Sequence, residues 1–118
     1  MQKINKIRGG SLIARALKDK GITNVFTLSG GFCNPALEGF MECQMNVINC
    51  PHEQVAGHLA DAHTRITRKP SICLVGPEGF ANAVPSMMEA WGERTPIIFI
   101  TGSSTLRRED SGGFKEID

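Results

Sequence analysis

The sequence predicts an α/β domain with a parallel sheet and helices on both of its faces. Short apolar runs alternate with longer segments of helical periodicity, a pattern typical of right-handed βαβ units. Two of the runs, at residues 71–75 and 95–100, are apolar almost throughout, as expected of strands buried on both faces. A length of 118 residues suits one compact domain, so we assign residues 1–118 to a single domain.

The first predicted helix covers residues 9–20 and precedes a short strand at 25–28. Ser11 is the expected N-cap, because its hydroxyl can accept a hydrogen bond from a free backbone N–H group. Gly21 ends the helix, since glycine readily adopts the left-handed conformation found at helix ends. The apolar face of this helix consists of Leu12, Ile13, Ala16 and Leu17.

The middle of the chain predicts two more helices with a strand between them. Pro35 opens a helix that runs to about residue 42, since proline is favoured in a first helical turn. A strand at 46–50 is stopped by Pro51, and a third helix covers residues 53–68. One apolar stripe on this third helix consists of Val55, Leu59, Ala62 and Ile66.

The last predicted elements are a strand at 71–75, a turn at 76–79, a helix at 80–91 and a strand at 95–100. The fourth helix carries an apolar patch made of Val84, Met87, Met88 and Trp91. This patch is either core, the commoner case, or a subunit interface, where methionine and tryptophan are enriched. After Gly102 the chain becomes polar, and no further element is expected.

The composition argues against several function classes. Thirteen basic and twelve acidic residues give a net charge of +1, which disfavours a polybasic surface for nucleic acid or anionic lipid. No apolar run is long enough to span a bilayer, and the basic start at 1–8 lacks the apolar stretch of a signal peptide. The four cysteines form no CxxC pair, which favours reduced thiols. We therefore expect a cytoplasmic protein with no nucleic-acid or membrane partner.

Ligands of parallel α/β sheets bind beyond the carboxyl ends of the strands. This rule selects the loops at 29–35, 50–53, 76–82 and 102–108. Glu53 directly follows the second strand and allows two interpretations. It is either an acid stabilised by the dipole of its helix, the commoner case, or a carboxylate at the mouth of the sheet that can exchange a proton.

Two other patterns are weak signals. His52, His58 and His63 are separated by six and five residues, so no two of them share a helical face, and HExxH is absent. We therefore expect no metal site. The glycines at 76–79 follow a strand, as in phosphate-binding turns, but match neither GxGxxG nor the Walker pattern. That turn is as readily explained as a structural link.

Four segments of the chain together form a specific pattern. Residues 50–65 begin Cys-Pro-His-Glu-Gln and match "HEQ-A-H-A-G-AR", and residues 25–31 match "VFG-PGG". Residues 74–84 match "LVTSGPGATNAV", and residues 95–104 with 113–118 match "VPVVAITG…FQE-D". In this order and spacing they resemble thiamine-diphosphate-dependent enzymes, including acetolactate synthases, benzaldehyde lyases and 2-hydroxyacyl-CoA lyases. The resemblance covers nearly the whole chain.

The resemblance implies a flavodoxin-like three-layer domain that binds the pyrimidine end of thiamine diphosphate. The implied reaction breaks or forms a C–C bond in 2-keto acids or 2-hydroxy carbonyl compounds. In the family, the glutamate that matches Glu53 hydrogen-bonds the pyrimidine nitrogen opposite the exocyclic amine. That bond favours the imino tautomer, which removes a proton from the thiazolium ring. Glu53 is therefore the implied catalytic residue.

Further site residues follow from the same resemblance. The implied cofactor-binding residues are Ser29, Gly30, Glu53, Glu78 and Asn82. The implied substrate-side residues are Phe32, Phe80 and Lys115. Two positions depart from the family pattern: Glu78 replaces a small residue or proline, and Lys115 stands where glutamine is usual.

The resemblance also implies partners. In the family a different domain with a GDG…N motif holds the diphosphate and Mg²⁺, and no GDG occurs in this chain. The family's pyrimidine domain also continues past the position that matches Asp118. We therefore expect a domain incomplete at its C-terminus, with an unpaired sheet edge, inactive alone and paired with a diphosphate-binding domain or subunit in a homo- or hetero-oligomer such as a dimer. The alternatives are a non-catalytic fragment or oligomerisation module of the same lineage, and an unrelated flavodoxin-like nucleotide-binding domain.

Overall fold

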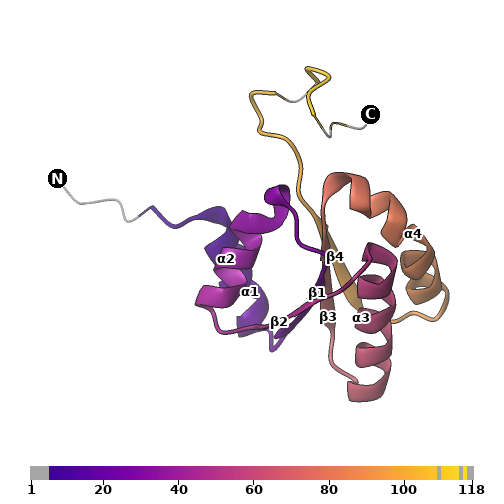
Figure 1. Ribbon diagram of the computed structural model, residues 1–118. Coiled ribbons are helices and arrows are strands. Elements are labelled where there is room, and N and C mark those ends of the chain that lie inside the picture. Colours follow the sequence, from indigo (N-terminus) through magenta and orange to yellow (C-terminus); the bar gives the residue numbers. More distant parts are fainter. Residues whose placement is uncertain (1–5, 109, 115, 117–118) are drawn as a thin grey trace.

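A computed structural model describes residues 6–108, 110–114 and 116 as a single sheet between two helical layers (Figure 1). The four strands are β1 (Asn24–Thr27), β2 (Asn46–Asn49), β3 (Ser71–Val75) and β4 (Ile97–Thr101). They are parallel and lie in the order β2-β1-β3-β4. After β1 the chain adds β2 on one side of it, and then β3 and β4 on its other side. The order in which strands are added therefore reverses between β1 and β3, and ligands of open α/β sheets bind at such a switch point.

Four helices and one short 3₁₀ turn complete the fold. They are α1 (Gly9–Asp19), η1 (Gly31–Cys33), α2 (Asn34–Glu42), α3 (Glu53–Thr67) and α4 (Pro77–Gly92). Helices α1 and α2 cover one face of the sheet, and α3 and α4 cover the other (Figure 1). This three-layer arrangement confirms the predicted fold class.

Alternate residues of the central strands supply two separate cores. Val25 of β1 and Leu74 of β3 face α1 and α2. Their neighbours Phe26 and Cys73 face α3 and α4. Side chains alternate between the two faces of a strand, so the nearly continuous apolar run of β3 reflects burial on both faces. All five residues of β3 are buried, and its bounds are those predicted from the sequence.

The predicted N-cap of the first helix is wrong. The helix begins at Gly9 with Arg8 as its N-cap, and Ser11 is a buried residue of its first turn. The Ser11 hydroxyl donates a hydrogen bond to Glu42 Oε2 of α2 at 2.7 Å. Two glycines permit this contact, because a Cβ at Gly10 would overlap the carbonyl oxygen of Pro35, and one at Gly39 would overlap that of Gly10. Close helix packing therefore takes Ser11 away from a capping role.

Much of the predicted apolar surface of the helices faces outward. On α3 the four stripe residues are exposed, whereas the small residues Ala56, Gly57 and Ala60 are buried. A Cβ at Gly57 would overlap the Ser86 hydroxyl of α4, so the two helices approach closely through their small residues. Bulky residues cannot occupy such a contact and lie on the outer flank instead. On α1, Leu12, Ile13 and Ala16 are exposed for the same reason.

The apolar patch on α4 is also mostly exposed, so its interpretation as core is wrong. Met88 is 64% exposed and Trp91 82% exposed, and Val84 is exposed as well. The other interpretation, a subunit interface, stays a prediction. The predicted turn at 76–79 is wrong too, because α4 already begins at Pro77. Proline is preorganised for a first helical turn, which explains the earlier start.

Strands β2 and β4 form the two edges of the sheet. Within the residues that the structure describes, no strand pairs with the outer side of β4, and four of its five residues are only half-buried. The chain then continues beyond the carboxyl ends of the strands as turns (Figure 1). Part of this segment is held by Glu116, which accepts hydrogen bonds from the Ser104 hydroxyl at 2.7 Å and the Gly113 N–H at 2.8 Å. The hydrogen bond from Ser104 is the main cause that lowers the pKa of Glu116.

Candidate functional site

Loops that follow β1, β2 and β3 border a cavity of about 250 Å³ at the switch point of the sheet. Its lining comprises Leu28, Ser29, Gly30, Gly31, Phe32, Glu53, Gly76, Pro77 and Glu78. The glycines and Ser29 contribute a largely main-chain wall, and Leu28 and Pro77 contribute apolar surface. Two carboxylates therefore face a small cavity in the position where parallel α/β sheets bind ligands.

The local sequence places Glu53 at this cavity. After β2, the Cys50 N–H donates to the Thr27 carbonyl at 2.7 Å, which carries the chain over the end of β1. His52 then caps α3, because its Nδ1 accepts a hydrogen bond from the Gln54 N–H at 3.1 Å. Glu53 is thereby the first residue of α3, and its side chain is half-buried. It is both a first-turn acid and a carboxylate at the mouth of the sheet.

The carboxylate of Glu53 lies against the first turn of α4. A Cβ at Gly79 would stand 2.5 Å from Glu53 Oε1, so the carboxylate rests directly on the α4 backbone. The Asn82 side-chain amide donates a hydrogen bond to Glu53 Oε2 at 3.1 Å. Both contacts lie near the N-terminus of α4, whose partial positive charge favours a carboxylate. The acid is therefore held between the starts of two helices.

The structure brings most of the sequence-predicted site residues together. Ser29, Gly30, Phe32 and Glu78 line the same cavity as Glu53. Asn82 is not part of that lining and reaches the site through its hydrogen bond to Glu53.

One predicted substrate-side residue, Phe80, is not brought to the cavity. Phe80 lies on α4, about a third exposed and outside the cavity lining. Lys115 lies outside the described residues. Gly79 was missed by sequence reasoning, although its spacing of three from Asn82 places both on one helical face once α4 begins at Pro77.

Two cysteines form part of the apolar core on the Glu53 side of the sheet. Burial raises the pKa of Cys73 to about 12, and the nearby Cys50 and Glu53 add to this effect. Burial also raises the pKa of Cys50, against a smaller opposing effect of its hydrogen bond with Thr27. Both thiols are therefore neutral, apolar groups, and the four cysteines form no disulfide.

We expect the cysteines to differ sharply in reactivity. At pH 8 a thiol with a pKa near 12 is thiolate in about one molecule in 10,000, and only the thiolate reacts with iodoacetamide. Cys73 and Cys50 should therefore resist labelling in the folded chain, whereas the half-buried Cys43 reacts first. Mass spectrometry of peptides after timed labelling measures the order. In denaturant all four should react, and fast labelling of Cys73 without denaturant would contradict the buried site.

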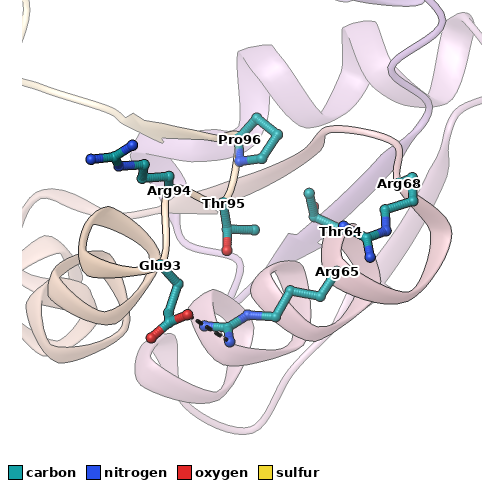
Figure 2. Close-up of a pocket in the computed structure, with 7 residues that line it drawn as sticks. All are labelled: Thr64, Arg65, Arg68, Glu93, Arg94, Thr95 and Pro96. Atoms are coloured by element: carbon teal, nitrogen blue, oxygen red, sulfur yellow. Dashed lines mark ion pairs between the residues drawn. The ribbon is translucent and has the colours of Figure 1, made fainter.

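A larger cavity of about 430 Å³ lies at the opposite end of the sheet (Figure 2). It is lined by Thr64, Arg65, Arg68, Glu93, Arg94, Thr95 and Pro96. Arg65 points toward Glu93, whereas Arg94 points away from it (Figure 2). The Arg65 guanidinium already pairs with three carboxylates, those of Asp61 at 2.8 Å, Glu89 at 3.6 Å and Glu93 at 3.8 Å. Its charge is thus matched, and its place at the amino ends of the strands makes this cavity the weaker candidate.

The histidines have structural partners. His58 Nδ1 lies 3.3 Å from Glu89 Oε2, and the His63 ring lies 5.6 Å from that of Phe26. Across the described ranges, no three His, Cys, Asp or Glu side chains are grouped so as to hold a metal ion. No helix in this part of the chain has the length and apolar character needed to cross a membrane.

Known proteins resemble this chain in sequence. The family described as "Thiamine pyrophosphate enzyme, N-terminal TPP binding domain" matches residues 7–118. The acetolactate synthase large subunit IlvG of Mycobacterium tuberculosis is 34% identical over 113 residues, which cover 95% of this chain and 21% of that protein. The 2-hydroxyacyl-CoA lyase 2 of Mus musculus is 30% identical over 123 residues, covering 100% of this chain and 19% of that protein. The chain thus spans about a fifth of the length of these relatives.

Solved structures share the fold. A protein from Mycobacterium smegmatis, assigned to the thiamin diphosphate-dependent enzymes, has a TM-score of 0.79 and 25% identity over 90% of this chain and 21% of its own. Benzoylformate decarboxylase from Polynucleobacter necessarius has a TM-score of 0.77 over 86% of this chain and 19% of its own, and at 24% identity it supports the fold alone. Because the family match covers nearly the whole chain, this chain belongs to the thiamine pyrophosphate enzymes and corresponds to their N-terminal TPP-binding domain.

Proposed function

We propose that this domain binds the pyrimidine end of thiamine diphosphate in an enzyme that breaks or forms C–C bonds of 2-keto acids or 2-hydroxy carbonyl compounds. The observation that carries the proposal is the position of Glu53. Its carboxylate starts α3, lines the cavity at the switch point and is held by α4. A fixed, half-buried carboxylate is the group needed to exchange a proton with a ring nitrogen.

The residues at the cavity fit one end of such a cofactor. Complete small-molecule sites usually enclose about 300–1,000 Å³, so a cavity of about 250 Å³ suits part of a ligand. Leu28 and Pro77 offer apolar surface for a flat ring, and Glu53 offers a polar edge. When bound, thiamine diphosphate supplies a centre that stabilises a carbanion next to the broken bond.

Each implied residue has a role that its position allows. Glu53 would hold or donate a proton at the ring nitrogen, and Ser29 and Gly30 would approach the ring from the loop after β1. Glu78 would place a second carboxylate at the cavity, and Phe32 would border the substrate side.

A further domain or subunit completes the site in this proposal. The chain spans about a fifth of its relatives, which leaves room for a domain that holds the diphosphate and Mg²⁺. Exposed apolar surface on α3 and α4, with Ile66 81% and Trp91 82% exposed, suits contact with such a partner in a dimer or larger oligomer. The exposed apolar surface on α3 and α4 also favours the second candidate, a non-catalytic oligomerisation module of this lineage.

We also propose a cytoplasmic location, because four cysteines without a disulfide suit a reducing compartment.

A titration separates these functions. The chain is titrated with thiamine diphosphate and Mg²⁺ by calorimetry, alone and with a separately expressed diphosphate-binding domain of an acetolactate synthase. Turnover of pyruvate is then measured in the same mixtures. Binding and turnover only in the presence of the partner are expected. Stable self-association without any response to the cofactor would favour the oligomerisation module, and affinity for FMN instead would overturn both candidates.

A further inference from the structure

Two residues of α4 contact the same carboxylate. Gly79 and Asn82 are three positions apart, so they share one face of the helix. That face meets the start of α3, where Glu53 lies. The position of the Glu53 carboxylate therefore depends on α4 as well as on its own helix.

Gly79 leaves a space for the Glu53 carboxylate that no larger residue would leave. A Cβ at this position would stand 2.5 Å from Glu53 Oε1, 2.7 Å from Cγ and 2.9 Å from Cδ. All three separations are far inside van der Waals contact, where carbon atoms normally sit about 3.5–4.0 Å apart. Any side chain at Gly79 would therefore displace the carboxylate from the α4 backbone.

Asn82 acts on the opposite oxygen of the same group. The terminal torsion of glutamate is broad and roughly two-fold, so the side chain itself does not fix the plane of its carboxylate. The Asn82 amide donates to Oε2 at 3.1 Å while Oε1 lies over Gly79. One contact on each oxygen restricts rotation of the carboxylate about its final bond.

We propose that Gly79 and Asn82 are positioning residues that set the plane of the Glu53 carboxylate, and that Asn82 acts on Glu53 rather than on the cofactor. The expected effect on rate rests on the proposed function. The contact between the Glu53 and Asn82 side chains does not depend on the proposed function, and it is tested separately. Orientation matters because a misplacement of about 1 Å at a reacting group can cost about 100-fold in rate.

The first test uses the 118-residue chain without cofactor. The side-chain amide signals of Asn82 are followed by ¹H–¹⁵N NMR. Gly79→Ala should move them, because it pushes the carboxylate away from Asn82. Gly92→Ala is the matched control, since a Cβ at Gly92 on the same helix meets nothing within 4 Å. Asn82 signals that stay in place in Gly79→Ala would overturn the proposed role of Gly79 in holding the Glu53 carboxylate.

The second test uses the chain assembled with a diphosphate-binding domain, thiamine diphosphate and Mg²⁺. Asn82→Ala and Asn82→Asp should lower kcat by about 10- to 100-fold with little change in the KM of pyruvate. Asn82→Asp keeps the shape, loses the donor and adds a second carboxylate beside Glu53, whereas Asn82→Ala loses the donor without adding charge, so the two variants together separate loss of the hydrogen bond from charge repulsion. Asn82→Gln keeps the donor and should recover part of the rate. Asn46→Ala is the control, because it removes a similar exposed bond, from Asn46 to Asn24 at 2.9 Å.

The outcomes separate the two proposals. Wild-type kcat in Asn82→Asp, or a change confined to cofactor affinity, would overturn the positioning role of Asn82. Absence of cofactor binding in the wild-type assembly would refute the proposed function. The NMR comparison would then still decide whether the carboxylate is held by Gly79 and Asn82.

Discussion

Replacing Glu53 with glutamine should reduce kcat of the assembled enzyme by at least about 100-fold while the domain keeps its fold. Glutamine has the same shape as glutamate, so it can begin α3 and place its side chain in the same space beside Gly79. It cannot exchange a proton at neutral pH, and a positioned acid or base typically contributes about 10²–10⁴-fold to rate. Steady-state kinetics with pyruvate measures the loss, and circular dichroism measures the thermal unfolding midpoint.

The control for this variant is Glu38→Gln, which changes an exposed carboxylate on α2, on the opposite face of the sheet. It should leave kcat unchanged. Turnover within a few-fold of wild type in Glu53→Gln would show that this carboxylate is not the catalytic acid. A large drop in the unfolding midpoint would instead point to a structural role for Glu53.

Gly10→Ala should destabilise the domain by about 3 kcal/mol, at the upper end of the usual cost of overpacking. The added Cβ would overlap the carbonyl of Pro35, which is main chain and cannot swing aside. Helices α1 and α2 would have to separate, which would stretch the hydrogen bond from Ser11 to Glu42. Because small domains are stable by only about 5–15 kcal/mol, a loss of this size is a large share of the total.

Gly9→Ala provides a matched control for this prediction. Gly9 is the neighbouring residue of the same helix, and a Cβ there meets nothing within 4 Å. It should change the free energy of unfolding by less than about 1 kcal/mol. Urea denaturation of the two variants and the wild type gives the comparison. Equal stability of Gly10→Ala and Gly9→Ala would contradict the close packing of α1 on α2.

The alternation of strands and helices could be predicted from the sequence because each element carries a local signal. Strand β3 has the predicted bounds, since its apolar run is set off by Pro70 and Gly76. The burial of the helix faces could not be predicted in the same way. Hydrophobic periodicity places Leu59 and Trp91 on apolar faces of their helices, whereas contact between small residues such as Gly57 and Ser86 decides which side is buried. That contact depends on helix separation, which no local pattern contains.

The candidate site, too, could be predicted from the sequence only in part. The rule that ligands bind at strand ends selects Glu53 and the loop after β1 from the sequence alone. The contact between Glu53 and Asn82 spans 29 positions along the chain and depends on how α4 lies beside α3. The family resemblance, not a local pattern, implies that Phe80 lies on the substrate side. In the structure Phe80 lies near the start of α4 and outside the cavity lining.

The close contact of Gly57 with Ser86 lies one helical turn beyond Glu53 and Asn82, and it has a consequence for how this protein can change. Because α3 and α4 are joined there without intervening side-chain bulk, they should move as one stiff body that carries the acid with it. The loop that begins at Leu28 belongs to a different part of the fold and follows β1. In the proposed function, Phe32 of this loop borders the substrate side, so a change at Phe32 should alter which substrates fit while the orientation of the Glu53 carboxylate stays the same.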